Sequence, residues 1–402
     1  MVSLFFIFVL VFSLVSLTCN ATHVSKYPAI FVFGDSTVDP GNNNYISTIL
    51  RANHKPYGRD FPTHVPTGRF TNGRLVTDFF ASSLGIKELV PPYLDPTLSN
   101  EDLRTGVSFA SAGSGLDDLT TVVTGVIPVS KQPKLFKEYK EKLIKIVGET
   151  EANCIIKEAM VIISAGTNDI VFSYYDSFVR RIEFSIDGYQ DFLLQKLHDR
   201  IKELYDLGCR TFALPGLSPI GCLPIQMTAN FENPSARTCL EEQNAHARSY
   251  NSKLEKLLPE IQVSLSGSKF IYASLYDPII DVINNPQKYD FLVTNRGCCG
   301  SGFLDKFICD VTTLPRYPAM FVFGDSTVDP GNNDFLPTMI KSNFFPYGQN
   351  FSDHIPTGRF TNGRLIMDFL ASLLGIKELV PPYIPNVVQA IKPSSLVSML
   401  PL

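Results

Sequence analysis

The sequence predicts an α/β fold, a three-layer α/β/α sandwich around a mostly parallel, five-stranded sheet. Five short runs rich in Val, Ile, Phe and Ala, each followed by turn residues, have the length of buried strands. Segments with helical apolar spacing separate the later runs, and this alternation is typical of a parallel sheet covered on both faces. The expected strands are Ala29–Asp35, Gly106–Ala112, Ala159–Gly166, Arg210–Pro215 and Lys269–Leu275.

Three helices are predicted from apolar periodicity. In Lys134–Val147 the apolar residues recur at intervals of three and four, which places them on one face. Tyr189–Leu207 repeats the pattern and is followed by Gly208, a residue type that commonly ends helices. The third helix is expected over Leu240–Ile261.

Length and composition limit the function classes. The 402 residues suffice for two or three domains, and a 45% hydrophobic content excludes wholesale disorder. The net charge of −4 lacks the basic excess of a general nucleic-acid binder. We therefore expect a folded protein that does not bind nucleic acid.

The N-terminus is typical of a secretory signal peptide. Met1–Leu17 is almost wholly apolar, small and polar residues follow it, and the first basic side chain is Lys26. The alternative is a membrane anchor, but the run is shorter than the roughly 20 residues that a spanning helix needs. We expect residues 1–22 to be removed on export, leaving a secreted, extracellular chain without a membrane span.

The cysteines are consistent with export. An odd number remains once Cys19 leaves with the signal peptide, which implies a free thiol or a missing partner in an oxidising compartment. Cys222 and Cys239 could form a local disulfide, although the connectivity does not follow from sequence. No cysteine pair has zinc spacing, so we expect no metal site. Asn20 and Asn350 begin glycosylation sequons.

A long segment of the chain occurs twice. Residues 317–386 align without a gap to residues 27–96, and roughly two thirds of the positions are identical. The offset is far longer than the periods of solenoid repeats, so the second copy is the start of a second domain. We expect one nearly complete domain over 27–310, a partial duplicate over 317–386 that is too short for a core of its own, and a tail over 387–402.

Three predicted strands end in residues suited to nucleophilic chemistry. Ser36, in GDS at 34–36, would lie at the carboxyl edge of the sheet, where α/β proteins bind ligands. Gly113, in ASAGSG at 110–115, lets a backbone N–H approach a ligand closely. Asn168, in GTND at 166–169, offers an amide donor for an oxyanion. Each block alone also fits an ordinary turn, and only their combination indicates a site.

Together these blocks resemble the GDSL esterase/lipase family of the SGNH hydrolases, most closely its plant secreted branch. The resemblance extends from Tyr27 to about Asp310. Thr37 departs from the family pattern, which has Leu, but it lies beside the nucleophile and takes no part in the chemistry. Further matching blocks are DPGNN at 39–43, PTGRFTNGR at 66–74, PGLSPIGCLP at 215–224, YD at 276–277, NP at 285–286 and CCG at 298–300.

The resemblance implies a flavodoxin-like SGNH fold and the hydrolysis of acyl or lipid esters through an acyl-serine intermediate. Ser36 matches the family nucleophile, and its backbone N–H with Gly113 and Asn168 matches the oxyanion hole. The implied partner is a small-molecule ester, no cofactor is required, and the implied location is the apoplast or cell wall.

The family's catalytic base is missing from the sequence. A serine hydroxyl is a weak nucleophile until an adjacent base takes its proton. In this family the base is a histidine three residues after an aspartate, in Asp-x-x-His-Pro. The sequence follows the family pattern through Cys309 and then enters the second copy, a loss that would also remove a cysteine partner. The histidines, none of which has Asp at this spacing, are His23, His54, His64, His198, His246 and His354.

We therefore predict a secreted GDSL-type esterase with strongly impaired activity. Each histidine fits a solvated or packed role better than that of a substitute base, because a base must first have the right geometry. Ser326, the counterpart of Ser36 in the second copy, lacks its own glycine and asparagine blocks. Two alternatives stay open: a secreted lipid- or ester-binding pseudoenzyme, and a fusion of two tandem copies without a function of its own.

Overall fold

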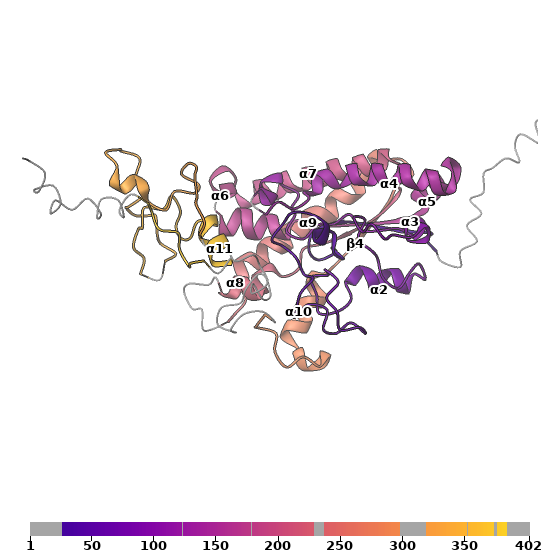
Figure 1. Ribbon diagram of the computed structural model, residues 1–402, viewed down its shortest axis with the longest axis horizontal. Coiled ribbons are helices and arrows are strands. Elements are labelled where there is room, and N and C mark those ends of the chain that lie inside the picture. Colours follow the sequence, from indigo (N-terminus) through magenta and orange to yellow (C-terminus); the bar gives the residue numbers. More distant parts are fainter. Residues whose placement is uncertain are drawn as a thin grey trace, which may run out of the picture.

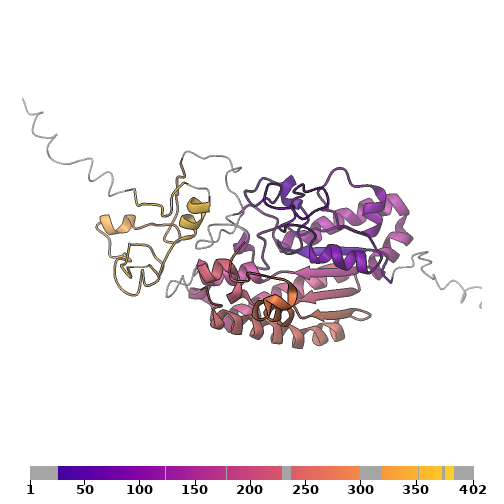
Figure 2. The same ribbon diagram turned by 90° about the horizontal axis from the view of Figure 1, so that it is seen from below.

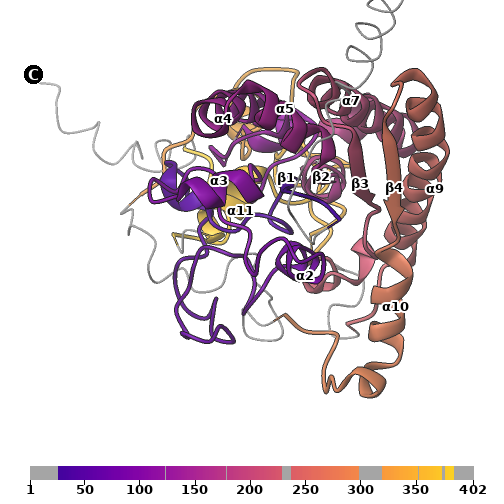
Figure 3. The same cartoon turned by 90° about the vertical axis from the view of Figure 1, so that its right-hand side faces the viewer.

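Four parallel strands form the central sheet, in the order β1-β2-β3-β4. Figure 1 shows the whole chain, and the four strands are labelled in Figure 3. The computed structural model describes residues 26–122, 124–177, 179–228, 237–297, 319–351, 353–373 and 376–383. The predicted signal peptide, the segment 298–318 and the predicted tail lie outside these ranges. The strands are β1 (Ile30–Gly34), β2 (Met160–Ser164), β3 (Thr211–Pro215) and β4 (Lys269–Ala273). The helices are α2 (Val76–Ser83), α3 (Asn100–Thr105), α4 (Gln132–Val147), α5 (Glu149–Glu158), α6 (Val179–Glu183), α7 (Ile186–Asp206), α8 (Pro224–Thr228), α9 (Glu241–Ser264), α10 (Tyr276–Asn284) and α11 (Ile366–Leu373).

The predicted parallel sheet is confirmed, but the structure has four strands where five were expected. The segment Gly106–Ala112 runs beside the outer edge of β1 and exchanges hydrogen bonds with Val32 and Gly34, yet it forms only isolated bridges. Its carbonyl groups at Ser108 and Ala110 accept hydrogen bonds from the Asn42 side chain, at 2.8 Å each. These two carbonyls lie on the edge of the segment that faces away from β1, because Val107, Phe109 and Ser111 make the bonds to β1. The Asn42 amide therefore satisfies the outer edge of the segment.

The two faces of the sheet are covered differently. On one face Phe31 and Phe33 point into a large cluster with residues of α4, α5, α7 and α9. The Phe31 ring lies 5.0 Å from that of Phe136 in α4, in an edge-to-face arrangement. On the other face Ile30 and Val32 pack in a smaller cluster that includes Ala81 of α2. Figure 3 shows α4, α5 and α7 on one side of the sheet and α2 on the other.

The three predicted helices are confirmed with shifted ends. α4 begins two residues earlier than expected, because Pro133 is tolerated in a first helical turn. α7 begins earlier as well, since the Ser185 hydroxyl accepts a hydrogen bond from the Gly188 N–H and caps it. Gly208 follows α7 with φ +118°, as its role in ending the helix requires. None of the described helices has the length and apolar character needed to cross a bilayer.

One of the described cysteines is a free thiol. Cys222 and Cys239 form a disulfide, as expected. Cys209, directly after α7, is a free thiol in the core, and its burial raises its pKa to about 12. Cys154 is disulfide-bonded. Cys209 is thus a free thiol of the kind that the odd count implied.

The C-terminal segment, residues 319–383 with the gaps given above, forms a lobe beside the sheet domain (Figure 2). It contains a short 3₁₀ turn, η8 (Asn332–Phe335), and helix α11. Arg359 pairs with Asp368 at 2.9 Å, as Arg69 pairs with Asp78 in the N-terminal segment. The described residues 319–324 form no strand.

Candidate active site

A cavity of about 290 Å³ opens at the carboxyl ends of β1 and β2. The chain leaves β1, passes along its outer edge at 106–112, and returns on the other side as β2. This change of direction makes the end of β1 a topological switch point, where α/β sheets bind ligands. The residues that line the cavity are Ser36, Thr37, Thr167, Asn168, Val171, Phe172, Ser218, Leu223, Pro224, Ile225 and Gly297.

Ser36 reaches this cavity because β1 ends in a tight turn. Gly34 has φ +135°, and a Cβ there would lie 1.9 Å from the Ser164 carbonyl oxygen, so only glycine fits. The Asp35 N–H donates to that same oxygen at 3.1 Å, which presses the turn against β2. Ser36 is left half-buried in the cavity wall, and its hydroxyl bonds to no residue in the described ranges.

Asp35 shapes the turn that carries Ser36. Its Oδ1 accepts hydrogen bonds from the Thr37 N–H at 2.9 Å and the Thr37 hydroxyl at 2.7 Å. The Thr37 hydroxyl also lies 2.9 Å from the Ser164 hydroxyl. Burial raises the pKa of Asp35 to about 6, and the bonds from Thr37 only partly offset this. Asp35 therefore acts on the backbone of the turn.

Gly113 lies in a loop that is bonded to the end of β1. It has φ +85°, and a Cβ would lie 2.3 Å from Leu50 Cδ1. The Ser111 N–H and the Ser114 hydroxyl both donate to the Gly34 carbonyl, at 3.0 and 2.8 Å. The N–H groups of Ser36 and Gly113 donate to no acceptor in the described part of the chain. Within the described ranges, both N–H groups are left to donate to a further acceptor.

Asn168 is held beside the glycine loop. It is buried, lines the cavity with Ser36, and donates from Nδ2 to the Ser114 carbonyl at 2.8 Å. The structure therefore brings Ser36 and Asn168 to one cavity and places Gly113 in the loop that bonds both Gly34 and Asn168.

Two buried carboxylates that sequence reasoning did not single out hold the site loops. Asp169 accepts hydrogen bonds from the N–H groups of Leu116 and Asp117 and from the Thr120 hydroxyl, at 2.7–3.0 Å. Asp39 accepts from the Ala112 N–H at 2.9 Å and also bonds its own turn. Burial raises both pKa values to about 6. Asp39 belongs to the DPGNN block and Asp169 to the GTND block, and this position was the sequence signal that could have identified them.

Five apolar side chains form much of the remaining cavity wall. Val171 and Phe172 come from the π-helical segment η4 (Asp169–Asp176), and Leu223, Pro224 and Ile225 come from the start of α8. π-Helical segments occur frequently at functional sites. A polar corner with Ser36 and Asn168 against apolar walls suits a substrate with one polar reacting group and an apolar chain.

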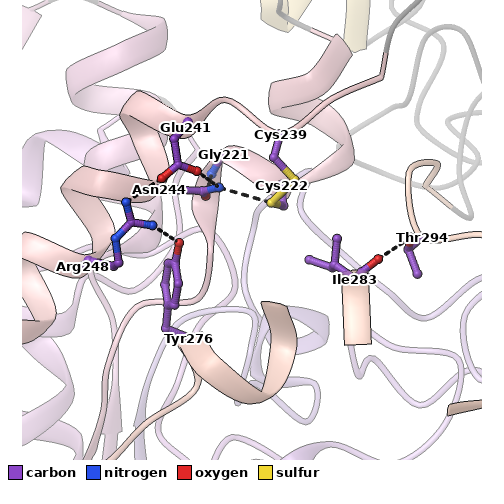
Figure 4. Close-up of a disulfide and its surroundings, with 9 residues drawn as sticks. All are labelled: Gly221, Cys222, Cys239, Glu241, Asn244, Arg248, Tyr276, Ile283 and Thr294. Atoms are coloured by element: carbon purple, nitrogen blue, oxygen red, sulfur yellow. Dashed lines mark hydrogen bonds and ion pairs between the residues drawn. A yellow bond between two sulfur atoms is a disulfide. The ribbon is translucent and has the colours of Figure 1, made fainter. Parts of the chain in front are cut away.

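The α8 wall is fixed to α9 at its base. Figure 4 shows the Cys222–Cys239 disulfide beside the Asn244 side chain of α9. Asn244 accepts from the Gly221 N–H at 2.9 Å and approaches Cys222 Sγ at 3.3 Å. A Cβ on Gly221 would lie 2.0 Å from the Leu240 carbonyl oxygen, so the two segments are in close backbone contact.

No histidine lines the cavity in the described part of the chain. Both ring nitrogens of His54 bond to backbone carbonyls, and His64 and His354 each bond one. His246 bonds the Tyr175 hydroxyl, and burial lowers its pKa. His198 faces a separate groove between α7 and α9. His23 lies outside the described residues.

Ser326 lies on the exposed surface of the C-terminal segment. The described residues there contain no counterpart of the loop with Gly113 or the turn with Asn168. Within the described ranges, no group of three or more His, Cys, Asp or Glu side chains is arranged to hold a metal ion.

Comparison with known proteins identifies relatives of the whole sheet domain. Residues 30–308 match the family model described as GDSL-like lipase/acylhydrolase. One GDSL esterase/lipase of Arabidopsis thaliana is 51% identical over 332 residues, which cover 80% of this chain and 91% of that protein. Two others from the same plant are 52% identical, over 301 residues (74% and 84% of the two chains) and 311 residues (76% and 86%).

Proposed function

The chain belongs to the GDSL-like lipase/acylhydrolase family, and we propose that it is a secreted serine hydrolase of acyl or lipid esters with Ser36 as nucleophile. Ser36 Oγ attacks the ester carbonyl carbon, the tetrahedral intermediate collapses with release of the alcohol, and water hydrolyses the acyl-serine. The single observation that carries this proposal is a pair of N–H groups, at Ser36 and Gly113, that have no acceptor in the described ranges. Ser36 lines the cavity with Asn168, and Gly113 lies in the loop that is bonded to Gly34 and Asn168.

These donors match the demand of the transition state. Negative charge develops on the former carbonyl oxygen, and fixed N–H donors stabilise it without reorganisation. The Ser36 and Gly113 backbones are held by Gly34, Asp39 and Asp169, so the donors are preorganised. The Asn168 amide supplies the third donor of the oxyanion hole. Removal of one such donor destabilises the transition state by about 3–4 kcal/mol.

The apolar walls support a substrate with a hydrocarbon acyl chain. Val171 and Phe172 face Leu223, Pro224 and Ile225 across the cavity, and apolar chains gain about 0.8 kcal/mol per buried methylene. The acyl group would occupy this space while its carbonyl meets Ser36. We expect small-molecule esters as substrates and no nucleic acid partner.

We further propose that the reaction is strongly impaired, because the described chain offers Ser36 no base. Among the described residues the Ser36 hydroxyl has no hydrogen-bond partner, and Asp-x-x-His is absent from the sequence. A site that retains only an oxyanion hole keeps a residual rate of about 10³–10⁴ over water. If even this rate is absent while ligands still bind, the chain is an ester-binding pseudoenzyme.

Hydrolysis of a short-chain aryl ester tests the assignment. The wild type should turn over slowly, and the double variant Ser36→Ala with Ser326→Ala should lose that rate. Imidazole added to the solution should accelerate the wild type and leave the double variant unchanged, since it supplies only the missing base. Turnover at ordinary family rates without imidazole would show that a substitute base exists.

The secretion and duplication proposals have their own tests. We propose that residues 1–22 direct export to the apoplast or cell wall, which N-terminal sequencing of the secreted chain would check. We also propose that residues 317–386 duplicate 27–96 by a tandem fusion. A transcript with a stop codon and a separate Asp-x-x-His exon after Cys309 would instead establish that the two copies are separate products.

A further inference from the structure

The C-terminal segment, residues 319–383, exposes side chains whose counterparts form the core of the sheet domain. Phe321 and Phe323 are 82% and 91% exposed, whereas their counterparts Phe31 and Phe33 are 0% and 1% exposed. Met339 in the same segment is fully exposed. Large apolar side chains exposed in this way are typical of residues that pack against a partner surface.

The sheet domain shows which surface covers these residues. Strand β1 pairs with β2 in parallel, with Phe31 beside Val161 and Phe33 beside Ile163. The Phe31 ring packs against Phe136 and Tyr139 of α4, at 5.0 and 5.2 Å between ring centroids. Residues 320–324 read MFVFG where β1 reads IFVFG, so only the first position differs. The surface that fits them is the β2 edge with the α4 face.

The residues that make polar contacts from the N-terminal segment to the rest of the sheet domain recur in the sequence of the C-terminal segment. Thr37 bonds Ser164, Asn42 bonds the carbonyls of Ser108 and Ala110, and Thr48 bonds the Thr124 carbonyl. Asp39, Asn43 and Lys87 make similar bonds to residues beyond position 96. The same residue types stand at the six matching positions: Thr327, Asp329, Asn332, Asn333, Thr338 and Lys377.

The C-terminal segment already holds the conformation that docking needs. Asp329 accepts from the N–H groups of Gly331 and Asn332 at 3.0 and 2.7 Å, and Asp39 makes the matching bonds at 2.8 and 2.7 Å. The Asn333 amide donates to the Ile340 carbonyl, as that of Asn43 does to Leu50. A preorganised segment loses little conformational entropy on binding.

We propose that residues 319–383 can take the place of residues 29–93 on the sheet of the same chain. The two segments would then exchange at the β1 position. The 21 residues between Gly297 and the segment could span about 70 Å when extended. Such a tether raises the effective concentration of the segment at its own sheet far above that of a second molecule. The chain thus contains two segments that could supply strand β1, but only one sheet with which they can pair. This inference does not rest on the proposed catalytic function.

Exchange places a second serine in the site. When the C-terminal segment occupies the β1 position, Ser326 takes the place of Ser36 beside the loop with Gly113 and the turn with Asn168. The described arrangement, with residues 29–93 on the sheet, is the favoured one, so exchange is exposed by weakening β1.

Hydrogen exchange read by mass spectrometry tests the proposal on the full chain. The variants are Phe31→Ala, the matched control Phe321→Ala, and both together. Peptides that contain Ile30 or Met320 distinguish the two segments. In Phe31→Ala, amides 320–324 should gain protection of at least about 10-fold while amides 30–34 lose it. Phe321→Ala should leave the protection of amides 30–34 and the melting temperature unchanged.

The double variant decides the outcome. If the segments exchange, the melting temperature of the double variant should be well below that of Phe31→Ala, because neither segment then packs fully against α4. The proposal is wrong if amides 320–324 stay unprotected in every variant and the double variant has the same melting temperature as Phe31→Ala. Protection that appears only together with a dimer in light scattering would also overturn the intramolecular form. If Phe31→Ala does not fold, the milder pair Val32→Ala and Val322→Ala repeats the same comparison.

Discussion

Replacing Asp35 by asparagine should stabilise the protein at neutral and alkaline pH. Burial raises the pKa of Asp35 from 3.8 to about 6, although Thr37 donates two hydrogen bonds to Oδ1. An aspartate whose pKa is higher in the folded state favours folding below its unfolded pKa and loses that contribution as the pH rises through 6. Asparagine keeps an oxygen that accepts from Thr37 and carries no charge. The free energy of unfolding of the variant therefore lacks this pH dependence.

The magnitude follows from the shift. At about 1.4 kcal/mol per pKa unit, a carboxylate shifted from 3.8 to about 6 destabilises the fold by about 3 kcal/mol at pH 8. At pH 5 the destabilisation is about half as large, because the folded carboxyl is still mostly protonated. Asp35→Asn should therefore gain about 3 kcal/mol at pH 8 and about half of that at pH 5.

Urea unfolding at pH 5 and pH 8 measures both values. Asp102→Asn is the control of opposite sign. Burial acts to raise the pKa of Asp102, but hydrogen bonds from Ser99 and the nearby Lys87 outweigh it and lower the pKa. That variant should lose stability at pH 8. A gain for Asp35→Asn that is absent at pH 8, or equal at both pH values, would refute the burial argument.

Three further outcomes follow from the core and the cysteines. Phe136→Ala should lower the free energy of unfolding by about 3–5 kcal/mol in urea, while Val263→Ala, at a position 87% exposed, should change it by less than about 0.5 kcal/mol. Cys209 should resist thiol reagents in the native protein and react after unfolding, as peptide mapping would show, because it is buried with a raised pKa. Cys239→Ser opens a disulfide with a sequence separation of 17 and should cost about 3 kcal/mol in urea, with weaker binding of ester ligands because the α8 wall loosens.

The sequence was sufficient to predict the elements whose signal is local. The apolar runs of β1 to β4 and the periodicity of α4, α7 and α9 predicted those elements within a few residues of their ends. The fifth strand was not predictable in this way. Gly106–Ala112 has the composition of a strand and bonds the edge of β1, but carbonyls on its other edge are bonded by the Asn42 amide, 66 residues away in sequence.

At the site, the sequence indicated which residues lie at strand ends but not what holds them there. Ser36 and Asn168 were predictable because parallel strands end at one edge of the sheet. The bonds from Asp169 to the backbone of Leu116 and Asp117 join segments more than 50 residues apart. The α8 wall depends likewise on Asn244, whose bonds to Gly221 and Cys222 no local pattern predicts.

The polar network explains how this site can persist without a base. The Ser36 turn, the Gly113 loop and the Asn168 turn are bonded to one another through Gly34, Ser114 and buried carboxylates, all within residues 34–169. None of these bonds involves a histidine. The donors for an oxyanion are therefore set by the fold itself, and the base is a separable addition to them. In our proposal, the lack of a base removes the activation of Ser36 but leaves a preorganised site that favours a tetrahedral oxyanion over a planar ester.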